Sequence, residues 1–314
     1  MNKLSQNRRE ALQIMGLTAG SALLNKPASA MTATKKTGPS FKYSLNMSTI
    51  RGQNLGFIKE IQTAAKAGFT SVEIWLDTFN TYLQNGGSIL EANRLLDDMG
   101  VKVENAIGFA EWMVDDEAKR KDALAQLNRQ MDLLAKIGCT RIAAPPAGAT
   151  GLPLIDLNII TDRYRAILDL GDKTGVTPMV EMWGGSHNLK KISQVLYIAA
   201  ESGHKNALVL LDAFHIYKGG SSLDSLPFVG KNAIEVFHIN DYPADIAPEK
   251  ISEPDRVYPG DGIAPLKQIL QIIKNPDKPV VISLEVFNES YYKQDPLLVA
   301  KTGLAKMKAL TENL

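Results

Sequence analysis

The sequence predicts an α/β fold of the (β/α)8 TIM barrel type, built as a single domain over residues 41–314. Short apolar or β-branched runs recur eight times, amphipathic stretches separate them, and no G-x-G-x-x-G turn follows any run. This alternation indicates parallel strands joined by right-handed crossovers. Eight such units favour a closed barrel over the main alternative, an open doubly wound sheet.

The eight runs are interpreted as buried strands because they are short and rich in aliphatic side chains. Their ranges are 42–48, 71–76, 102–108, 141–146, 177–183, 207–212, 234–240 and 279–287. The stretches between them repeat apolar residues at three- and four-residue steps, which is typical of one-sided helices. Several end in glycine, as at Ala67-Gly68, which indicates a left-handed cap. The predicted helices lie within 55–68, 88–100, 117–138, 158–175, 188–203, 265–275 and 295–314, with a short one within 222–231.

Composition sets broad limits on function. The chain has 314 residues, 45% of them hydrophobic and 22% charged, which is ordinary for a globular protein with a large core. The net charge is +1 and no basic stripe is present, which argues against nucleic acid as a partner. The single cysteine, Cys139, excludes an intrachain disulfide and a multi-cysteine zinc site.

The first 30 residues have the order of a twin-arginine (Tat) export signal. Arg8 and Arg9 precede a short, weakly hydrophobic stretch, and a small-x-small cleavage site follows at residues 28–30. The alternative is an amphipathic N-terminal helix of a cytoplasmic protein. We expect a periplasmic protein with a flexible leader over residues 31–40. The apolar stretch is too short for stable membrane insertion once the signal is removed.

Four consecutive predicted strands carry ionisable residues at or near their carboxyl ends, where barrels place their chemistry. These residues are Glu181, Asp212, His238 and Glu285. Three converging carboxylates would repel one another, and a divalent metal removes that conflict. Carboxylates with one imidazole suit Mn²⁺, Mg²⁺, Co²⁺ or Zn²⁺. The alternative is that each residue is an isolated helix cap or ion-pair partner, and Asp212 at a strand end also fits a cap.

Five motifs carry a resemblance to a known family. In chain order they are "VEMW", "LLDAFH", "FHIND", "DRVYPGDG" and "SLEVF". Their order and spacing resemble the xylose isomerase-like TIM barrels, in the sugar phosphate isomerase/epimerase branch with hydroxypyruvate isomerase, ketose 3-epimerases and inosose dehydratase. The resemblance covers roughly residues 42–312. It implies a sugar substrate. It also makes a homo-oligomer possible for this chain, because barrels of this family commonly associate as homodimers or tetramers.

The resemblance also implies roles for individual residues. Glu181, Asp212, His238 and Glu285 would bind one divalent metal ion. His215, in the Asp-x-x-His match, would hold a substrate oxygen, and Arg256 would bind a substrate hydroxyl or carbonyl. For Arg256 the alternative is a solvated loop arginine. The zinc-dependent endonuclease branch of the family is set aside, because strands two and three lack histidine and Val257 stands where a second loop histidine would be.

We hypothesise proton transfer next to a carbonyl through an enediolate, with Glu181 and Glu285 as the transfer pair. Return of the proton to the same carbon would give an epimerase, and return to the neighbouring carbon an isomerase. Loss of a leaving group would instead give a lyase, dehydratase or hydrolase acting on keto-glycosides. A non-catalytic periplasmic sugar-binding barrel is the third possibility.

Further residues are candidates for contact with the sugar. Glu73 and Trp75 share one face of the second strand by the two-residue period. Trp112 follows the third strand, and Trp183 lies beside Glu181; indole rings pack well on sugar C–H faces. His187 stands where the ketose 3-epimerases carry a second glutamate, and is either a polar substrate contact or a loop residue. This departure and the export signal favour an unphosphorylated sugar or an oxidised keto-sugar.

Overall fold

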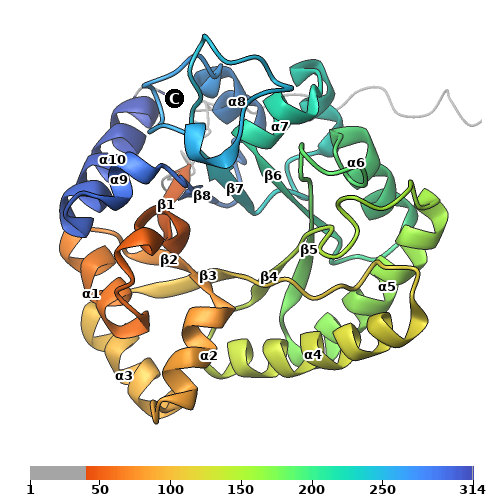
Figure 1. Cartoon of the computed structure of the whole chain (residues 1–314), viewed down its shortest axis with the longest axis horizontal. Coiled ribbons are helices and arrows are strands. Elements are labelled where there is room, and N and C mark those ends of the chain that lie inside the picture. Colours follow the sequence, from red (N-terminus) through yellow and green to blue (C-terminus); the bar gives the residue numbers. More distant parts are fainter. Residues whose placement is uncertain (1–39, 313) are drawn as a thin grey trace, which may run out of the picture. The chain divides into compact units, whose positions relative to one another are not determined.

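Eight parallel strands surround one axis, with helices packed on their outer side (Figure 1). The computed structural model describes residues 40–312 and residue 314. The strands are β1 (Phe41–Asn46), β2 (Ser71–Trp75), β3 (Lys102–Ile107), β4 (Arg141–Ala144), β5 (Thr177–Glu181), β6 (Leu208–Asp212), β7 (Val236–Ile239) and β8 (Val280–Leu284). All eight predicted strands are confirmed, and most end earlier than predicted. At β4 the reason is local, because the two prolines that follow Ala144 have no N–H to donate.

The strand order confirms a TIM barrel. Hydrogen-bonded neighbours follow the order β3-β2-β1-β8-β7-β6-β5-β4, and every ladder is parallel. The first and last strands therefore pair with each other, with Ser44 opposite Ser283. Strands β3 and β4, at the two ends of this order, lie side by side and bring the sheet close to full closure (Figure 1). Because all the strands are parallel, their carboxyl ends lie at one face of the barrel.

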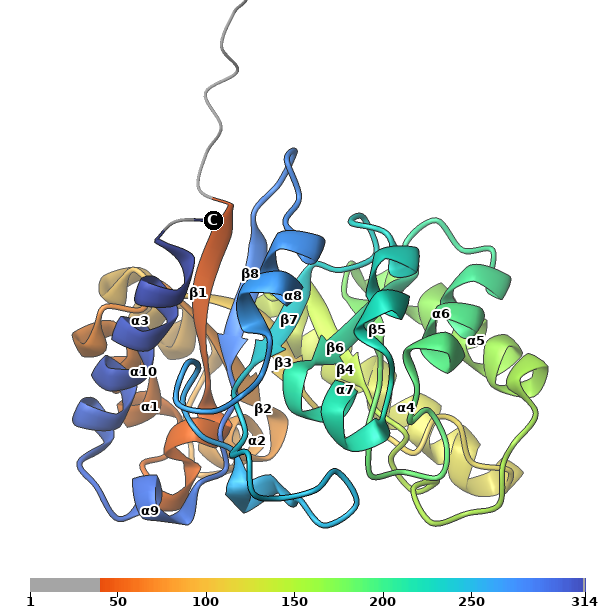
Figure 2. The same ribbon diagram turned by 90° about the horizontal axis from the view of Figure 1, so that it is seen from above.

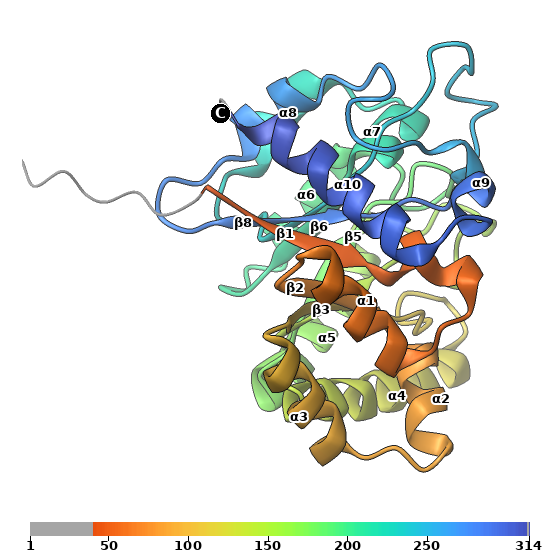
Figure 3. The ribbon, with the colours of Figure 1, turned by 90° about the vertical axis from the view of Figure 1, so that its left-hand side faces the viewer.

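The predicted outer helices are present. They are α1 (Phe57–Ala67), α3 (Ile89–Met99), α4 (Glu117–Lys136), α5 (Leu157–Thr174), α6 (Ile192–Glu201), α8 (Leu266–Ile273) and α10 (Pro296–Thr311), with the 3-10 segment η2 (Leu223–Val229) in the short predicted stretch. Gly68 ends α1 with a φ of 98°, which confirms the predicted left-handed cap. Helices α1 and α10 lie side by side across the first and last strands (Figure 3).

Several short helices follow strand ends and were not predicted, because their periodic patterns are too brief to detect. They are η1 (Met47–Gln53), α2 (Leu76–Gln84), α7 (Ala213–Gly219), η3 (Glu253–Asp255) and α9 (Glu289–Tyr292). Figure 2 shows α2, α7 and α9 at the end of the barrel away from the start of β1. They surround the face onto which the strand carboxyl ends open.

Side chains fill the inside of the barrel. The cluster consists of Ile107, Ala143, Met179, Leu208, Leu210, Val236 and Val281, with Trp75 packed against it. A separate and larger cluster joins the outer faces of the strands to the helices. Each fully buried aliphatic side chain of this kind contributes about 1.5–3 kcal/mol. The apolar filling closes the barrel interior beside the polar residues at the strand ends.

The predicted export signal and nearly all of the predicted leader lie outside the described residues. Among the residues that are described, no helix is long and apolar enough to cross a membrane.

Candidate metal centre and cavity

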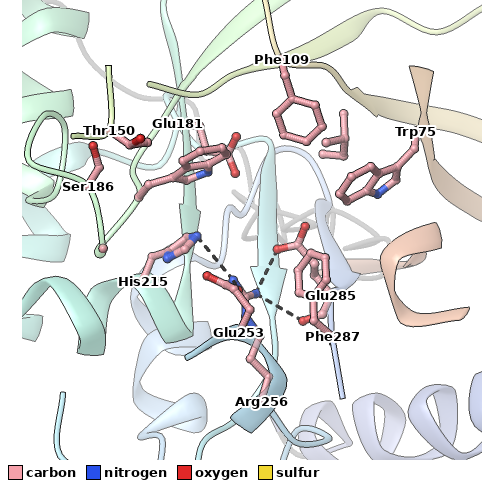
Figure 4. Close-up of a pocket in the computed structure, with 13 residues that line it drawn as sticks. Trp75, Phe109, Thr150, Glu181, Ser186, His215, Glu253, Arg256, Glu285 and Phe287 are labelled. Atoms are coloured by element: carbon pink, nitrogen blue, oxygen red, sulfur yellow. Dashed lines mark hydrogen bonds and ion pairs between the residues drawn. The ribbon is translucent and has the colours of Figure 1, made fainter. Parts of the chain in front are cut away.

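A cavity of about 270 Å³ opens at the carboxyl ends of the strands, on the face predicted to carry the chemistry (Figure 4). Its walls come from loops after several strands and combine charged, polar and aromatic side chains. The lining residues are Trp75, Ile107, Phe109, Thr150, Glu181, Trp183, Gly185, Ser186, His215, Glu253, Arg256, Glu285 and Phe287. The structure therefore brings Glu181, Glu285, His215, Arg256 and Trp183 of the predicted site to one cavity.

Three of the four predicted metal ligands form a tight buried group. One ligand atom from each of Asp212, His238 and Glu285 lies within 4.8 Å of the others. Nδ1 of His238 is 3.0 Å from Oε2 of Glu285 and 3.9 Å from Oδ2 of Asp212. The sheet register explains the arrangement, because Asp212 and His238 are opposite each other on β6 and β7, and Glu285 follows β8 directly.

Glu181, the fourth predicted ligand, lies next to this group. It ends β5, and its Oε1 is 4.0 Å from Nδ1 of His238. Burial raises the pKa of Glu181 to about 8, against the opposing effect of His238, and the nearby carboxylate of Glu285 adds to the rise. A cation bound next to this carboxyl group would stabilise its ionised form.

Glu73 holds the imidazole of His238 from the opposite side. Its Oε2 lies 3.0 Å from Nε2 of His238, and both side chains are fully buried. Burial lowers the pKa of His238, but Glu285 and Glu73 outweigh it and keep that pKa well above its ordinary value. Glu73 does not line the cavity, so the predicted sugar contact is corrected to a contact that orients the histidine.

The donor set fits a divalent metal ion. Nδ1 of His238 is buried and faces the carboxylates, 3.0 Å from Oε2 of Glu285 but without the alignment of a hydrogen bond, while Nε2 is held by Glu73. A carboxylate behind a metal-binding histidine is the usual arrangement at such sites. Glu181, Asp212, His238 and Glu285 would hold the ion, and this set of oxygens with one nitrogen suits several divalent metals.

Arg256 is buried within the same cluster. Its Nη1 donates to Oδ2 of Asp212 at 2.7 Å and to Oε2 of Glu285 at 3.0 Å, and Nη2 forms an ion pair with Glu253. The guanidinium lies 4.4 Å from the ring centroid of Phe214 and so packs on its face. The alternative of a solvated loop arginine is therefore wrong, and Arg256 is the cation that compensates these carboxylates.

His215 lines the cavity beside Arg256. Its Nε2 is 3.4 Å from Nη2 of Arg256, and its Nδ1 has no hydrogen-bond partner among the described residues. Burial lowers the pKa of His215, which favours the neutral ring. The backbone N–H of His215 donates to Oδ1 of Asp212 at 3.1 Å. Asp212 thus caps α7 with one oxygen, which confirms the predicted cap, and its other oxygen faces His238 and Glu285, which leaves it free to act as the predicted metal ligand.

Four aromatic residues line the cavity and form what we call the aromatic wall: Trp75, Phe109 and Phe287, which Figure 4 labels, and Trp183. The ring centroid of Trp75 lies 5.3 Å from that of Phe109 and 6.1 Å from that of Phe287. Phe109 in turn lies 6.2 Å from Trp183. The wall provides an apolar surface that suits the C–H face of a sugar ring, and the guanidinium of Arg256 lies 5.2 Å from the ring centroid of Phe287.

Two predicted sugar contacts do not reach the cavity. Trp112 is buried in the barrel wall, where its indole N–H donates to the carbonyl of Pro145 at 2.9 Å and its ring packs on Tyr164. His187 is exposed at the surface, while the preceding Ser186 lines the cavity in its place. Trp112 is therefore corrected to a packing residue, whereas for His187 the alternative of a loop residue fits the structure. The path of the loop after a strand sets the direction of such side chains.

The sequence reasoning missed several residues of the site. Asn240 donates to both carboxylate oxygens of Asp212, at 3.1 and 3.0 Å, and Asn46 contacts Glu285 and Glu73. Glu253, on η3, pairs with Arg256 at the cavity edge. Asn46 is the last residue of β1. It therefore lies at a strand end, as the predicted carboxylates do, and its position could have been predicted in the same way.

Comparisons with known proteins agree with this geometry. The family model described as "Xylose isomerase-like TIM barrel" matches residues 61–310. An inosose isomerase of Halalkalibacterium halodurans is 24% identical over 258 residues, covering 80% of this chain and 90% of the relative.

Solved structures show the same fold. The IOLI protein with a bound zinc atom superposes with a TM-score of 0.79 at 22% identity, covering 87% of this chain and 98% of the other. A D-psicose 3-epimerase crystallised with D-fructose gives 0.67 at 18% identity, covering 86% and 99%. With the family model matching most of the sequence, the chain belongs to the xylose isomerase-like TIM barrel family.

Proposed function

We propose that this chain is a divalent-metal-dependent isomerase or epimerase that moves a proton next to the carbonyl of an unphosphorylated ketose or keto-sugar. The observation that carries the proposal is that Glu181 and Glu285 line one cavity from different strands, beside a histidine and an aspartate suited to a metal ion. The inosose isomerase relative and the epimerase neighbour support this class of reaction.

Each polar residue of the cavity has a role in the proposed reaction. A bound divalent ion supplies a Lewis acid that acidifies the C–H next to a carbonyl. One of Glu181 and Glu285 removes that proton, and the other returns it. His215 and Arg256 hold substrate oxygens, since both line the cavity, and Nδ1 of His215 and the Nε–H of Arg256 have no hydrogen-bond partner among the described residues. Return to the other face of the same carbon is epimerisation, and return to the adjacent carbon is isomerisation.

The charge of the cavity supports an unphosphorylated substrate. Arg256 is the one basic side chain with a permanent charge among the lining residues, and its guanidinium is engaged with Asp212, Glu285 and Glu253. A phosphate group would therefore meet carboxylates with no free cation to receive it. A neutral polyol or keto-sugar meets no such repulsion.

The same proton abstraction would serve a lyase, because a leaving group on the next carbon would depart in place of reprotonation. The aromatic wall of Trp75, Phe109, Trp183 and Phe287 favours this second candidate, since an apolar surface suits a non-sugar substituent of a keto-glycoside. Unchanged product mass distinguishes an isomerase from a lyase, which gives two fragments.

NMR in D₂O tests the proposal directly. The protein with Mg²⁺ or Zn²⁺ is mixed with a panel of ketoses and 3-keto-glycosides, and deuterium is expected at a carbon next to the carbonyl. Glu285→Gln should abolish this exchange, whereas Glu117→Gln, a matched change at an exposed position of α4, should retain it. Full exchange by Glu285→Gln would refute the proposed transfer pair. No exchange by the metal-loaded protein with any substrate would favour a sugar-binding barrel.

We further propose that the protein works in the periplasm, on the basis of the twin-arginine motif at Arg8 and Arg9. Replacement of both arginines by lysine should retain the uncleaved precursor in the cytoplasm, as cell fractionation would show. Processing and export of the double variant at the normal level would contradict this localisation.

A further inference from the structure

Asn46 occupies the centre of a buried hydrogen-bond network beneath the cavity. It is the last residue of β1, and its side chain is fully buried. Its Nδ2 donates to Oε2 of Glu73 at 3.1 Å and to Oε1 of Glu285 at 3.0 Å. Its Oδ1 accepts from the indole Nε1 of Trp75 at 2.9 Å and from the backbone N–H of Ser48 at 3.0 Å. Both donors and both lone pairs of the amide are therefore used.

The partners leave the amide a single orientation. A flipped side chain would aim its two N–H groups at the N–H groups of Trp75 and Ser48, and its oxygen at two carboxylates. No hydrogen bond would form in that orientation. An aspartate here would likewise lose the N–H donors that the carboxylates of Glu73 and Glu285 accept from. The position thus specifically matches an amide.

Asn46 links three parts of the site. With Oε1 of Glu285 held by the amide, Oε2 lies 3.0 Å from Nδ1 of His238 and 3.0 Å from Nη1 of Arg256. Glu73 fixes the other nitrogen of His238. On the remaining side, the bond from Trp75 fixes the indole that forms part of the aromatic wall.

We propose that Asn46 is a positioning residue that orients the carboxylate of Glu285 toward the metal group and holds the indole of Trp75 in the substrate wall. The role in turnover rests on the proposed function, while the role in metal binding does not. Loss of the amide would leave two buried carboxylates short of a donor and the indole N–H without its acceptor. The oxygen that faces His238 would then be held by Arg256, without the contact from Asn46 that fixes the other oxygen of the same carboxylate.

Asn105 supplies a matched control. It is a buried asparagine on β3 whose Nδ2 donates to Oε1 of Glu73 at 2.6 Å. It therefore shares one partner with Asn46, but the structure gives it no hydrogen bond to Glu285 or Trp75. Comparison of Asn46→Ala with Asn105→Ala separates the contacts that matter for the proposal from general damage to the buried network.

Two readouts independent of turnover test the proposal on the full chain. Mn²⁺ affinity, measured by calorimetry or EPR, should fall about 10–100-fold in Asn46→Ala, as is typical when a group supporting a metal ligand is lost, and less in Asn105→Ala. The near-ultraviolet circular dichroism of the tryptophans should change in Asn46→Ala and remain near wild type in Asn105→Ala. With an active substrate, KM should rise only in the Asn46 variant.

The outcomes distinguish this proposal from the proposed function. Wild-type Mn²⁺ affinity in Asn46→Ala, or equal losses in the two variants, would overturn the positioning role. Absence of deuterium exchange by the metal-loaded wild type would refute the proposed function, yet the Mn²⁺ comparison would still decide the role of Asn46. If Asn46→Ala does not melt cooperatively, Asn46→Ser keeps a hydroxyl at the site and is subject to the same comparison.

Discussion

The guanidinium of Arg256 donates to Oδ2 of Asp212 at 2.7 Å, inside the group of side chains suited to a divalent metal. The same Nη1 lies 3.0 Å from Oε2 of Glu285. Two oxygens of the proposed metal ligands therefore already contact a buried cation. Because like charges repel strongly where water is excluded, we expect Arg256 and a bound metal ion to compete for these oxygens.

This competition predicts how an Arg256→Met variant behaves. Removal of one partner from a buried ion pair costs about 3–5 kcal/mol, so the melting temperature in EDTA should fall well below that of the wild type. A saturating divalent metal should restore much of the loss, because it neutralises Asp212 and Glu285 in place of the guanidinium. Thermal melting with EDTA and with Mn²⁺ measures both effects.

Lys306→Met is the control for this experiment, since Lys306 forms a half-exposed ion pair with Asp261, outside this group. Such pairs contribute about 0–1 kcal/mol, and the change should be equally small with and without metal. If Mn²⁺ raised the melting temperature of Arg256→Met no more than that of the wild type, the competition would be disproved.

Glu73→Gln is predicted to weaken metal binding without removing a ligand. The carboxylate of Glu73 lies 3.0 Å from Nε2 of His238, and an amide there holds the imidazole less strongly. The metal dissociation constant, measured by calorimetry, should rise about 10–100-fold. Glu104→Gln is the matched control, because Glu104 is an equally buried strand carboxylate that pairs with Lys42 and Arg141. Equal metal affinities in the two variants would argue against the role of Glu73.

The placement of Glu73 shows what the sequence could and could not predict. The two-residue period correctly puts Glu73 and Trp75 on the inner face of β2, but it says nothing about depth along the barrel axis. Trp75 reaches the cavity, whereas Glu73 lies beneath it against His238. The depth depends on the register with neighbouring strands, which shifts between Val72 and Glu73 in the pairing with β3.

Residues at strand ends were easier to predict than residues in loops. Glu181, Asp212, His238 and Glu285 lie together because parallel strands fix where their ends meet. Trp112 and His187 lie beyond strand ends, and the path of each loop turned them away from the cavity. Tertiary packing determines such paths, and no local pattern in the chain encodes them.

Gly184→Ala is predicted to displace the helix that carries His215. A Cβ at Gly184 would lie 2.4 Å from the carbonyl oxygen of His215 and 2.5 Å from the backbone nitrogen of Gly219. These are backbone atoms, so α7 must move, at a cost of about 1–3 kcal/mol for overpacking. Melting temperature and substrate exchange should both fall.

Gly151→Ala is the control for this change. A Cβ at Gly151 meets nothing within 4 Å, so Gly151→Ala should leave both measurements unchanged. Wild-type exchange in Gly184→Ala would show that the position of His215 is not critical.

Glu60 is predicted to make the stability of the barrel depend on pH. This carboxyl group of α1 is only 4% exposed, and burial raises its pKa to about 7, in spite of the nearby Arg51. The folded state therefore favours the protonated form. The stabilisation is complete below the unfolded pKa of 4.5 and is lost as the pH rises through about 7. Glu60→Gln cannot ionise, so it should match the wild type at pH 4 and be more stable at pH 8, by at most about 3 kcal/mol. Urea unfolding at the two pH values measures this difference, with the exposed Glu117→Gln as the control that shows no such dependence on pH. A Glu60→Gln variant no more stable than the wild type at pH 8 would show that the folded protein accommodates the ionised carboxylate without cost.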